Sequence, residues 1–496
     1  MKGGFFRMFD LVVIGTGAGL TVAEAAAKRG LEVAIIEKGK FGGTCLTRGC
    51  IPSKMLVYPA DMLREAERAH KVGLTFEKPR IDWDLISRRV WERIDVSKEI
   101  EQTFSTIPNV TCFKGEGRFT GPNTMRVRLN GGGEAELSGK KFLIAAGAHT
   151  RVPHIQGLEE AGYITSESFF GDRYPKKPWK SLIIWGTGTV AMEFAHIFAA
   201  FGTDVTVFGR NPRLLPHEEP EISDLLRWQM KDFGVKLHTG YDVISVEKTL
   251  EGKLVTARSK ETGEIITAVA EELLVAAGVE PATKSLGVDL AGVETDEAGW
   301  IKADQYLKTS VPHIYALGDI LGGYLFRHKA NYEADILINN WFSPDSPKRA
   351  ADYRAIPWAI FTMPQIGHVG MTEEQVRQAG IRYHVGRYRY SYIATGMAMG
   401  YEDGDGDNGM VKLLLDERLR ILGVHIAGFQ AAALVQPFVY LMNAGDPLKD
   451  AKAGTLLPLM RSMVIHPTLS ELAAWSIESV DFSQPIDPRE AESAKQ

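Results

Sequence analysis

The feature that most limits the possible folds is a pattern that occurs twice: an apolar strand, a glycine-rich turn, a helix and a second strand. In the first copy, an apolar run at 11–14 leads into the glycines of 15–19, a helix-forming stretch follows, and another apolar run ends at Glu37. Glycines at such a turn let the backbone approach a pyrophosphate at the helix N-terminus, and the acid about twenty residues on accepts a ribose hydroxyl. We therefore predict a βαβ dinucleotide-binding unit.

The second copy spans residues 181–208, with Gly186 and Gly188 in its turn. Two copies in one chain predict two bound dinucleotides. The third glycine of the usual motif is replaced in both copies, by Leu20 and by Ala191. The acid that ends the first copy, Glu37, also has no counterpart at the end of the second copy.

In place of that acid stands Gly209, and Arg210 and Arg213 follow. Loss of the acid together with gain of two cations suits the 2′-phosphate of NADP(H), because guanidinium groups match phosphate oxygens. The alternative is that both arginines are ordinary surface residues.

Only three cysteines occur in the 496 residues, and Cys45 and Cys50 are close together in the sequence. A disulfide that closes so short a loop stabilises a fold by only about 2 kcal/mol. In a regular helix the two Cα atoms would lie about 8.6 Å apart, beyond the roughly 7 Å that a disulfide allows. The pair can therefore bond only across an irregular turn, for which Gly42, Gly43 and Gly49 supply the backbone freedom.

The segment that follows favours chemistry over a structural staple. Pro52 suits the first turn of a helix that continues through Lys54. A thiol at a helix N-terminus gains thiolate character, so we interpret the pair as a redox-active disulfide. The alternatives are two inert thiols or a metal site, although zinc sites use four ligands and Cys112 is the only other cysteine.

Residues 42–54 read Gly-Gly-Thr-Cys-x4-Cys-Ile-Pro-Ser-Lys and resemble the active-site signature of the class I pyridine nucleotide–disulfide oxidoreductases. The resemblance extends over roughly residues 9–475 and implies FAD at the first unit and NADP(H) or NAD(H) at the second. Residues 309–319 resemble the family's second FAD motif, and residues 328–330 resemble a segment under the flavin. In the first unit and its continuation, the residues assigned to cofactors are Gly15, Gly17, Gly19, Glu37, Lys38, Gly43, Thr44, Lys54, Gly117, Gly147, Asp319 and Ala330; in the second they are Gly186, Gly188, Glu193, Arg210, Arg213, Val243 and Gly278.

The resemblance also implies a mechanism. A nicotinamide reduces the flavin, the flavin reduces the disulfide, and the dithiol exchanges with a substrate. Cys50 would lie against the flavin, and Cys45 would exchange with the substrate. Lys54 and Glu193 resemble the ion pair beside the reactive nitrogen of the flavin.

Residues 464–471, Val-Ile-His-Pro-Thr-Leu-Ser-Glu, resemble the segment that carries the family's acid/base. His466 would donate and accept protons, and Glu471 would orient its ring and raise its basicity. The partner subunit supplies this histidine in the family, so we expect a homodimer with shared active sites.

The expected fold is α/β, with two Rossmann-like domains and a C-terminal α+β interface domain. The boundaries predicted are 1–152 for the FAD-binding domain, 153–280 for the NAD(P)-binding domain, 281–352 for the return to the first domain and 353–496 for the interface domain. Helices are predicted at 62–70, 85–104, 431–443 and 451–457, and strands at 410–415 and 421–426, the last four segments lying in the interface domain.

Composition excludes several classes of protein. The chain is 45% hydrophobic and has a net charge of −5, so no charge excess favours nucleic acid or an anionic membrane surface. No apolar run reaches the roughly 18 residues of a membrane span, and the start of the chain does not resemble a secretion signal. Few cysteines suit a reducing compartment, so we expect the cytoplasm.

The subfamily is the most open question. Residues 51–54, 328–330 and 468–471 favour dihydrolipoamide dehydrogenase, which is our first interpretation. Residues 15–20, 193–196 and 436–437 are more similar to mycothione reductase, so an NADPH-dependent reductase of the mycothione or glutathione type is the alternative. Mercuric and thioredoxin reductases are disfavoured because residues 490–496 lack a cysteine pair. A flavoprotein oxidase or transhydrogenase with no disulfide substrate, or a non-enzymatic scaffold, would leave the Cys45–Cys50 pair unexplained.

Overall fold

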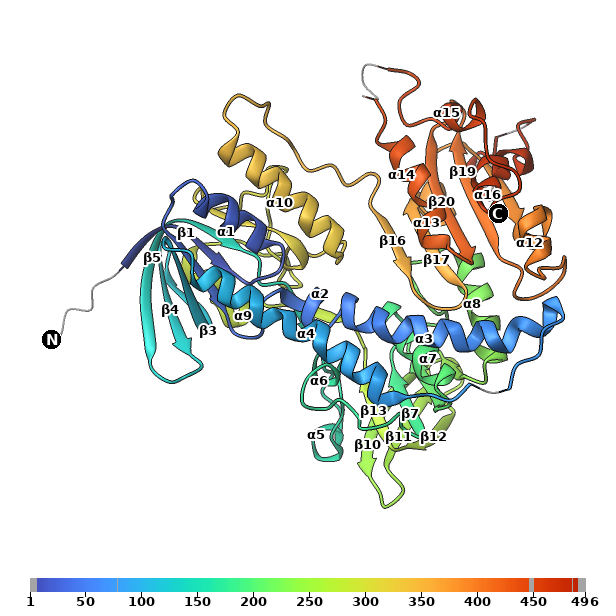
Figure 1. Ribbon diagram of the computed structural model, residues 1–496, viewed down its shortest axis with the longest axis horizontal. Helices are drawn as coiled ribbons and strands as arrows, with labels where there is room; N and C mark the ends of the chain where they lie inside the picture. Colours follow the sequence, from blue (N-terminus) through green and yellow to red (C-terminus); the bar gives the residue numbers. More distant parts are fainter. Residues whose placement is uncertain (1–6, 78, 446–449, 484, 489–496) are drawn as a thin grey trace.

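The first glycine-rich pattern forms the centre of a six-stranded sheet in the computed structural model, which describes residues 7–488 except 78, 446–449 and 484 (Figure 1). β1 (Arg7–Ile14) lies between β2 (Val33–Glu37) and β5 (Glu134–Ile144) and is parallel to both. Residues 11–14 of β1 and most of β2 are apolar runs without alternation, because both faces of this part of the sheet are covered. The remaining elements are α1 (Gly19–Ala27), β3 (Val110–Gly121) and β4 (Thr124–Leu129), and β4 joins β3 to β5 by antiparallel pairing.

The second pattern forms a separate four-stranded parallel sheet in the order β13-β7-β8-β9. α7 connects β7 to β8 and is buried along most of its length, as the apolar sequence of this helix requires. A three-stranded antiparallel sheet, β10-β11-β12, belongs to the same unit. The bounds are α5 (Leu158–Ala161), α6 (Ser166–Phe169), β7 (Ser181–Trp185), α7 (Thr189–Ala200), β8 (Asp204–Gly209), α8 (Pro220–Asp232), β9 (Lys236–Thr239), β10 (Tyr241–Lys248), β11 (Lys253–Ser259), β12 (Ile265–Ala270) and β13 (Glu272–Val275).

The second unit is inserted between two parts of the first. β6 (Ala148–Thr150), where the chain enters the second unit, pairs with β14 (Val279–Pro281), where the chain leaves it. After α9 (Thr283–Leu286) and η2 (Val288–Ala291), β15 (Ile314–Ala316) adds to the first sheet by pairing with β5. η3 (Gly318–Leu321) and α10 (Arg327–Phe342) follow, and α10 packs against α1.

The C-terminal part is a five-stranded antiparallel sheet in the order β16-β17-β20-β19-β18, with short helices around it. Its strands are β16 (Pro357–Ile360), β17 (Gln365–Gly370), β18 (Tyr383–Arg389), β19 (Met410–Asp416) and β20 (Ile421–Gly428). Its helices are α11 (Glu373–Gln378), α12 (Ala394–Ala398), α13 (Ala431–Leu434), α14 (Gln436–Met442), α15 (Leu457–Met460) and α16 (Ser470–Trp475), with the 3-10 turns η4 (Tyr390–Tyr392) and η5 (Ser476–Ser479).

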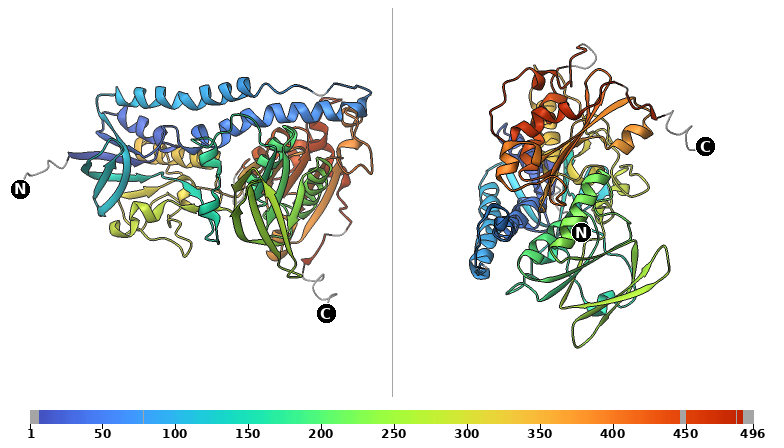
Figure 2. Two further views of the ribbon diagram at one scale, coloured as in Figure 1. Left: turned by 90° about the horizontal axis from the view of Figure 1, so that it is seen from below. Right: turned by 90° about the vertical axis from the view of Figure 1, so that its right-hand side faces the viewer.

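Two long helices run side by side along one edge of the molecule (Figure 2). They are α3 (Cys50–Arg68) and α4 (Trp83–Ser105); α2 (Gly43–Thr47) precedes them, and η1 (Ala69–Val72) follows α3. α3 packs against both α4 and α7, so one helix joins the first unit to the second.

Two predictions in the C-terminal part need correction. The helix predicted at 451–457 is wrong: residues 451–454 form turns, Gly454 has a positive φ of 71°, and the helix begins only at Leu457. The helix predicted at 431–443 is divided into α13 and α14, because Pro437 stands in the first turn of α14 and cannot continue a ladder of backbone hydrogen bonds.

None of the helices in the described part of the chain is long and apolar enough to cross a membrane. The expectation about a secretion signal depends partly on residues 1–6, and the expectation about a C-terminal cysteine pair depends on residues 490–496. Both segments lie outside the described residues.

Candidate active site

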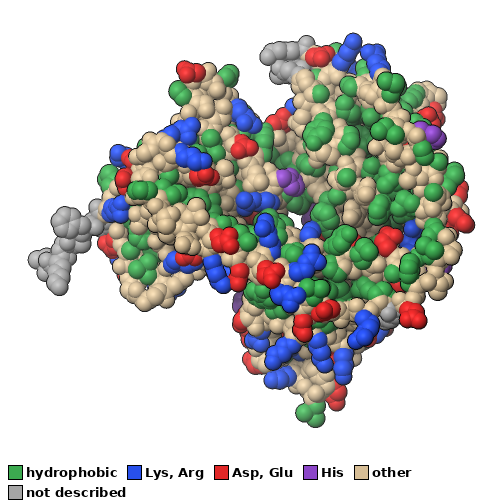
Figure 3. Space-filling view, viewed as in Figure 1, with side chains coloured by type: hydrophobic (Ala, Val, Ile, Leu, Met, Phe, Trp, Pro, Cys, Tyr) green, Lys and Arg blue, Asp and Glu red, His purple; other side chains and the backbone are tan. Residues whose placement is uncertain are grey.

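A cavity of about 2360 Å³ lies where the two glycine-rich units and the C-terminal sheet meet. Figure 3 shows the molecule hollowed between the lobe that carries α10 and the C-terminal lobe. Since most ligand pockets measure about 300–1,000 Å³, this cavity has room for more than one large ligand. All the site residues predicted from the sequence line it, except Gly19, Arg213, His466 and Glu471.

The first glycine of each turn is required by a neighbouring strand. Gly15 has a φ of +94°, and a Cβ there would lie 2.4 Å from the carbonyl oxygen of Ala145. Gly186 has a φ of +147°, and its Cβ would lie 2.1 Å from the carbonyl oxygen of Ala276. The same steric constraint therefore operates in both units, and only glycine satisfies it.

Gly19 explains why Leu20 can replace the third glycine of the first motif. A Cβ at Gly19 would lie 2.9 Å from side-chain carbons of both Ala145 and Val13. The close contact of helix and sheet that the third glycine normally permits is thus made one residue earlier. In the second unit, Ala191 is fully buried at the corresponding place.

The first turn, the Glu37 carboxylate and the segment before Cys45 form one cradle. A Cβ at Gly43, whose φ is +68°, would lie 2.7 Å from the Cα of Gly17. Oε2 of the buried Glu37 accepts hydrogen bonds from the backbone N–H (3.1 Å) and the hydroxyl (2.6 Å) of Thr16. A glycine-lined backbone at the N-terminus of α1 beside a carboxylate fits a dinucleotide such as FAD.

Asp319 forms another wall of this cradle. Burial raises the pKa of its carboxyl group. The loop is held by Glu333 of α10, which accepts the Gly318 backbone N–H at 2.7 Å and pairs with Lys329 at 2.9 Å. The partly buried Asp319 carboxyl group at the cavity wall can accept hydrogen bonds from the hydroxyl groups of a ligand. The ribityl chain of FAD carries such hydroxyl groups, so this wall fits FAD as well.

The two cysteines lie on different helices that meet at an irregular turn. Cys45 lies within α2, and Cys50 is the first residue of α3. Arg48 (φ −157°, ψ 19°) and Gly49 (φ −142°, ψ −116°) break the helical path between them. The structure contains both residues as thiols, and both face the cavity.

The two thiols differ in acidity. The hydrogen bond from Cys50, with smaller contributions from the positive charges of Arg327 and Lys54, lowers the pKa of the Cys45 thiol to about 7, although burial opposes the shift. The pKa of Cys50 is raised, chiefly because its proton is held by Cys45. Near neutral pH the first proton to leave this coupled pair therefore leaves a thiolate centred on Cys45.

Lys54 and Glu193 form an ion pair at the same wall. Nζ of Lys54 on α3 lies 2.8 and 2.7 Å from the two carboxylate oxygens of Glu193 on α7. The backbone N–H of Phe361 donates to the same carboxylate at 3.1 Å, and its ring lies 4.5 Å from Nζ. The pair thereby joins the first unit, the second unit and the C-terminal part at the cavity.

The end of β8 excludes an acidic side chain. A Cβ at Gly209 would lie 2.2 Å from the Cγ2 of Thr187, which is itself buried in the glycine-rich turn. Arg210 is exposed and lines the cavity, whereas Arg213 is exposed and does not line it. The structure thus brings only one of the two predicted arginines to the cavity.

His466 and Glu471 contact each other but face away from the cavity of their own chain. Nδ1 of His466 lies 2.5 Å from Oε1 of Glu471, whose other oxygen accepts the Thr468 backbone N–H at 3.3 Å. Glu471 is fully buried, while 64% of the His466 side chain is exposed. Next to the histidine, Ile465 and Met463 are also exposed, so this part of the chain presents an apolar surface around an imidazole.

Sequence reasoning missed two groups of cavity residues. Arg327 is the first residue of α10 and contributes to the lowered pKa of Cys45. It directly precedes residues 328–330, which resemble the segment under the flavin, and this position could have identified it from the sequence. Glu218 and Trp358 line another wall, and Glu218 contacts His368 and His425. No short motif connects these residues, so the sequence offered no signal for this group.

The sequence pattern of the family described as "Pyridine nucleotide-disulphide oxidoreductase" matches residues 9–334, and that of its dimerisation domain matches residues 356–477. The chain is 33% identical to mycothione reductase of Mycobacterium tuberculosis, over 94% of this chain and 97% of that protein. It is 32% identical to dihydrolipoamide dehydrogenase of Chaetomium thermophilum, over 93% of this chain and 89% of that protein.

The fold is also similar to that of a solved structure, the HOCl-induced flavoprotein disulfide reductase RclA from Escherichia coli in its Cu(II) complex. The TM-score is 0.80 at 27% sequence identity, with 96% of this chain and 99% of that chain covered.

Proposed function

Because the chain belongs to the pyridine nucleotide-disulphide oxidoreductase family, whose members are flavoproteins that use FAD and NAD(P)H, we propose that Cys45 and Cys50 exchange electrons with a disulfide or dithiol substrate. The observation that carries the proposal is the position of the thiol pair. It lies at the junction of α2 and α3, at the wall of a cavity that also contains both glycine-rich turns.

The chain's own groups account for the exchange in the direction of disulfide reduction. The Cys45 thiolate attacks one sulfur of the substrate disulfide, which forms a mixed disulfide and releases the other sulfur as a thiolate. Cys50, as a thiolate, then attacks the Cys45 sulfur, which forms the Cys45–Cys50 bond and releases the second substrate sulfur. Bound FAD, with NAD(P)H, supplies the two electrons that return the pair to thiols.

Each departing substrate sulfur needs a proton. We assign this proton transfer to His466 of the partner subunit, because the His466 ring of this chain is directed outward and not into its own cavity. The buried Glu471 carboxylate fixes Nδ1 and leaves Nε2 as the nitrogen that exchanges a proton.

Two substrates remain as candidates. Lipoamide and dihydrolipoamide are the first, favoured by the likeness of residues 51–54, 328–330 and 468–471 to dihydrolipoamide dehydrogenase. A low-molecular-weight disulfide of the mycothione or glutathione kind, reduced with NADPH, is the second. The close contact of Gly209 with Thr187 favours the second candidate, because it excludes the acid that would accept the 2′-hydroxyl of NADH and repel a phosphate.

The deciding measurement is kcat/KM for lipoamide, mycothione and glutathione disulfide, each with NADH and with NADPH. Arg210 offers a charge-assisted hydrogen bond to a 2′-phosphate, worth about 1.5–3 kcal/mol, so we expect NADPH to be preferred by roughly tenfold to a hundredfold. Arg210→Ala should remove about one decade or more of kcat/KM with NADPH and leave the value with NADH unchanged.

Arg213→Ala is the matched control, since this arginine is exposed but lies outside the cavity. It should leave both values close to wild type. A wild-type enzyme that prefers NADH would contradict the assignment of the nucleotide and favour a typical dihydrolipoamide dehydrogenase. Absence of activity with every disulfide in the panel would contradict both substrate candidates.

A further inference from the structure

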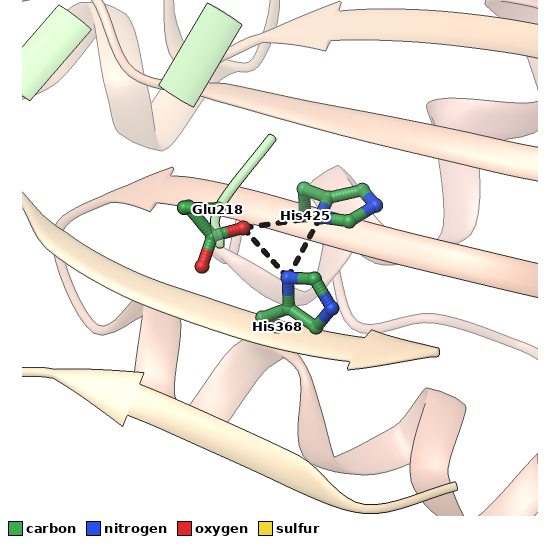
Figure 4. A group of neighbouring side chains, drawn as sticks. All are labelled: Glu218, His368 and His425. Atoms are coloured by element: carbon green, nitrogen blue, oxygen red, sulfur yellow. Dashed lines mark hydrogen bonds and ion pairs between the residues drawn. The ribbon is translucent and has the colours of Figure 1, made fainter. Parts of the chain in front are cut away.

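A second group of reactive side chains joins the second unit to the C-terminal sheet (Figure 4). Glu218 lies just before α8, His368 lies on β17, and His425 lies opposite His368 on β20. All three side chains are buried, both histidines completely. The proposed function uses none of them.

Three potential ligand atoms converge in this group. Oε1 of Glu218 lies 2.6 Å from Nδ1 of His368 and 3.2 Å from Nδ1 of His425. The two Nδ1 atoms lie 2.9 Å apart. These distances are those of direct contact, so only a proton or a metal ion could lie among the three atoms.

The other nitrogen of each ring is already committed. Nε2 of His368 lies 2.9 Å from the carbonyl oxygen of Gly370, and Nε2 of His425 lies 3.0 Å from that of Met371. Carbonyl oxygens only accept, so both Nε2 atoms carry a proton, and a ring that holds no second proton presents a lone pair at Nδ1. The two Nδ1 atoms and the carboxylate oxygen therefore face one another in an arrangement that needs a proton or a metal ion among them.

Lys412, which pairs with His425 between β19 and β20, does not supply this charge. Nζ of Lys412 lies 2.6 Å from carboxylate oxygens of Glu219, Glu221 and Glu373, so it is committed to a separate group. Among the described residues, Glu218 receives only neutral donors besides the imidazoles: the indole N–H of Trp358 at 3.0 Å and the backbone N–H of Glu219 at 2.9 Å. A buried carboxylate is costly without a compensating positive charge.

The donor set and its surroundings match a divalent transition metal. Two imidazoles and one carboxylate form a three-residue ligand set for Zn²⁺ or a similar first-row divalent metal ion, with water as the fourth ligand. Metal-bound histidines usually donate their other N–H to a carbonyl oxygen or carboxylate, as both do here. With bonds of about 2.1 Å, adjacent ligand atoms lie about 3.0–3.4 Å apart. The separations of 2.9 and 3.2 Å are close to this range, and only the contact of 2.6 Å has to lengthen.

We propose that Glu218, His368 and His425 bind Zn²⁺ or a closely related divalent metal ion, which clamps the nucleotide-binding second unit to the C-terminal sheet. Glu218 and Trp358 line the large cavity, which provides the route of entry. The indole of Trp358 fixes Oε2, so that Oε1 is held toward the two histidines.

The test uses the FAD-loaded enzyme with Cys45, Cys50 and Cys112 replaced by Ser, so that no thiol binds metal. After removal of metal with a chelator, the protein is titrated with Co²⁺ and with Zn²⁺. We expect one equivalent of Zn²⁺ per chain by calorimetry, Co²⁺ d–d absorption at wavelengths beyond the flavin bands, and a rise in Tm on addition of metal.

Glu218→Gln in the same background is the decisive variant. Its amide can still accept from Trp358 and can donate to an imidazole, so the fold is kept without metal, as retained FAD and the metal-free Tm would show. Its Kd for Zn²⁺ should rise by more than the roughly 10–100-fold that loss of an outer-shell partner costs. His368→Ser should lose the Co²⁺ bands as well.

His196→Gln is the matched control, because His196 is equally buried but contacts a single carboxylate, that of Asp61, at 2.8 Å. Its affinity for metal should equal that of the parent protein. The proposal is overturned if the cysteine-free enzyme binds no stoichiometric metal, in which case a proton shared by the three groups accounts for their contact. It is equally overturned if Glu218→Gln binds Zn²⁺ as tightly as the parent, whether or not His368→Ser folds.

Discussion

Cys45 and Cys50 are the same residue type, yet their surroundings give them opposite acidities. Cys45 accepts the hydrogen bond and lies near two cations, whereas Cys50 donates its proton to Cys45. Cys45 is therefore the better nucleophile in the reduced pair, which suits the exchange with substrate that we propose for it.

The reactivity of Cys45 should follow its own titration. Because the pKa of this thiol in the folded protein is lowered to about 7, the thiolate is present above pH 7 and is lost as pH falls through 7. The rate of alkylation of Cys45 by iodoacetamide in the reduced enzyme, followed by mass spectrometry, should rise with pH to a plateau with a midpoint near 7. Cys50→Ala removes the thiol that donates the hydrogen bond to Cys45, so the midpoint of Cys45 alkylation in this variant should lie clearly higher. An unchanged midpoint would contradict the hydrogen-bond explanation.

Replacing Cys45 should transfer the thiolate to Cys50. The pKa of Cys50 is raised partly by its hydrogen bond and charge interaction with Cys45, and Lys54 lowers it. In Cys45→Ser the repulsion is gone and the attraction to Lys54 remains. We expect a long-wavelength charge-transfer absorption band in the oxidised, FAD-loaded variant. Cys50→Ser should lack the band, and a band of equal strength in both variants would refute the assignment of Cys50 to the flavin side.

At the scale of single elements, the cavity depends on where helices begin. α3 begins at Cys50 and carries Lys54 one turn later, so one helix positions both the thiol and the cation. α7 begins directly after Gly188 and carries Glu193 one turn later. The Lys54–Glu193 ion pair is thus a contact between the first turns of two helices.

Gly43 should be indispensable for cofactor binding, because its Cβ would meet the Cα of Gly17 at 2.7 Å and its φ is +68°. Gly43→Ala should push the two loops of the cradle apart and release FAD, measured as loss of flavin absorbance after gel filtration. Gly131→Ala is the control, since this glycine is exposed, is not in the positive-φ region and has open space around its Cβ position. Retention of FAD at wild-type affinity in Gly43→Ala would show that the cradle does not hold the cofactor.

At the scale of the whole molecule, three parts of the chain surround one cavity, but His466 is directed outward. The C-terminal part matches the family's dimerisation domain, and Met463 and Ile465 beside the histidine are exposed apolar residues. These observations support a homodimer in which each subunit completes the site of the other.

Mixed dimers can test this sharing directly. A heterodimer of a Cys45→Ser subunit and a His466→Ala subunit, isolated with two affinity tags, should keep one intact site and about half of the wild-type activity. Each variant homodimer should lose at least about a hundredfold.

A wild-type subunit paired with a Cys45→Ser/His466→Ala subunit provides the reverse control. Both of its sites then lack one essential group, so shared sites predict almost no activity. If each subunit worked alone, the two heterodimers would show the opposite result, with activity only in the second.

The sequence by itself determined the local features of this protein. The two strand–turn–helix units, the irregular Cys45–Cys50 turn and the start of α3 depend on glycine, proline and apolar residues that are neighbours along the chain, so their conformations follow from short-range sterics. The helix predicted at 451–457 was wrong for a related reason: Gly454 adopts a positive φ, residues 451–454 form turns, and the helix begins only at Leu457.

Only the tertiary structure decided which distant groups meet. Glu218 and His368 are 150 positions apart in the sequence, and neither stands in a motif that predicts the contact. No local motif predicts that Arg327 lies near Cys45 or that Arg213 lies outside the cavity. The chemistry of these groups is fixed by burial and by the shape of the cavity wall, and both arise from the packing of whole sheets and helices, which no local pattern encodes.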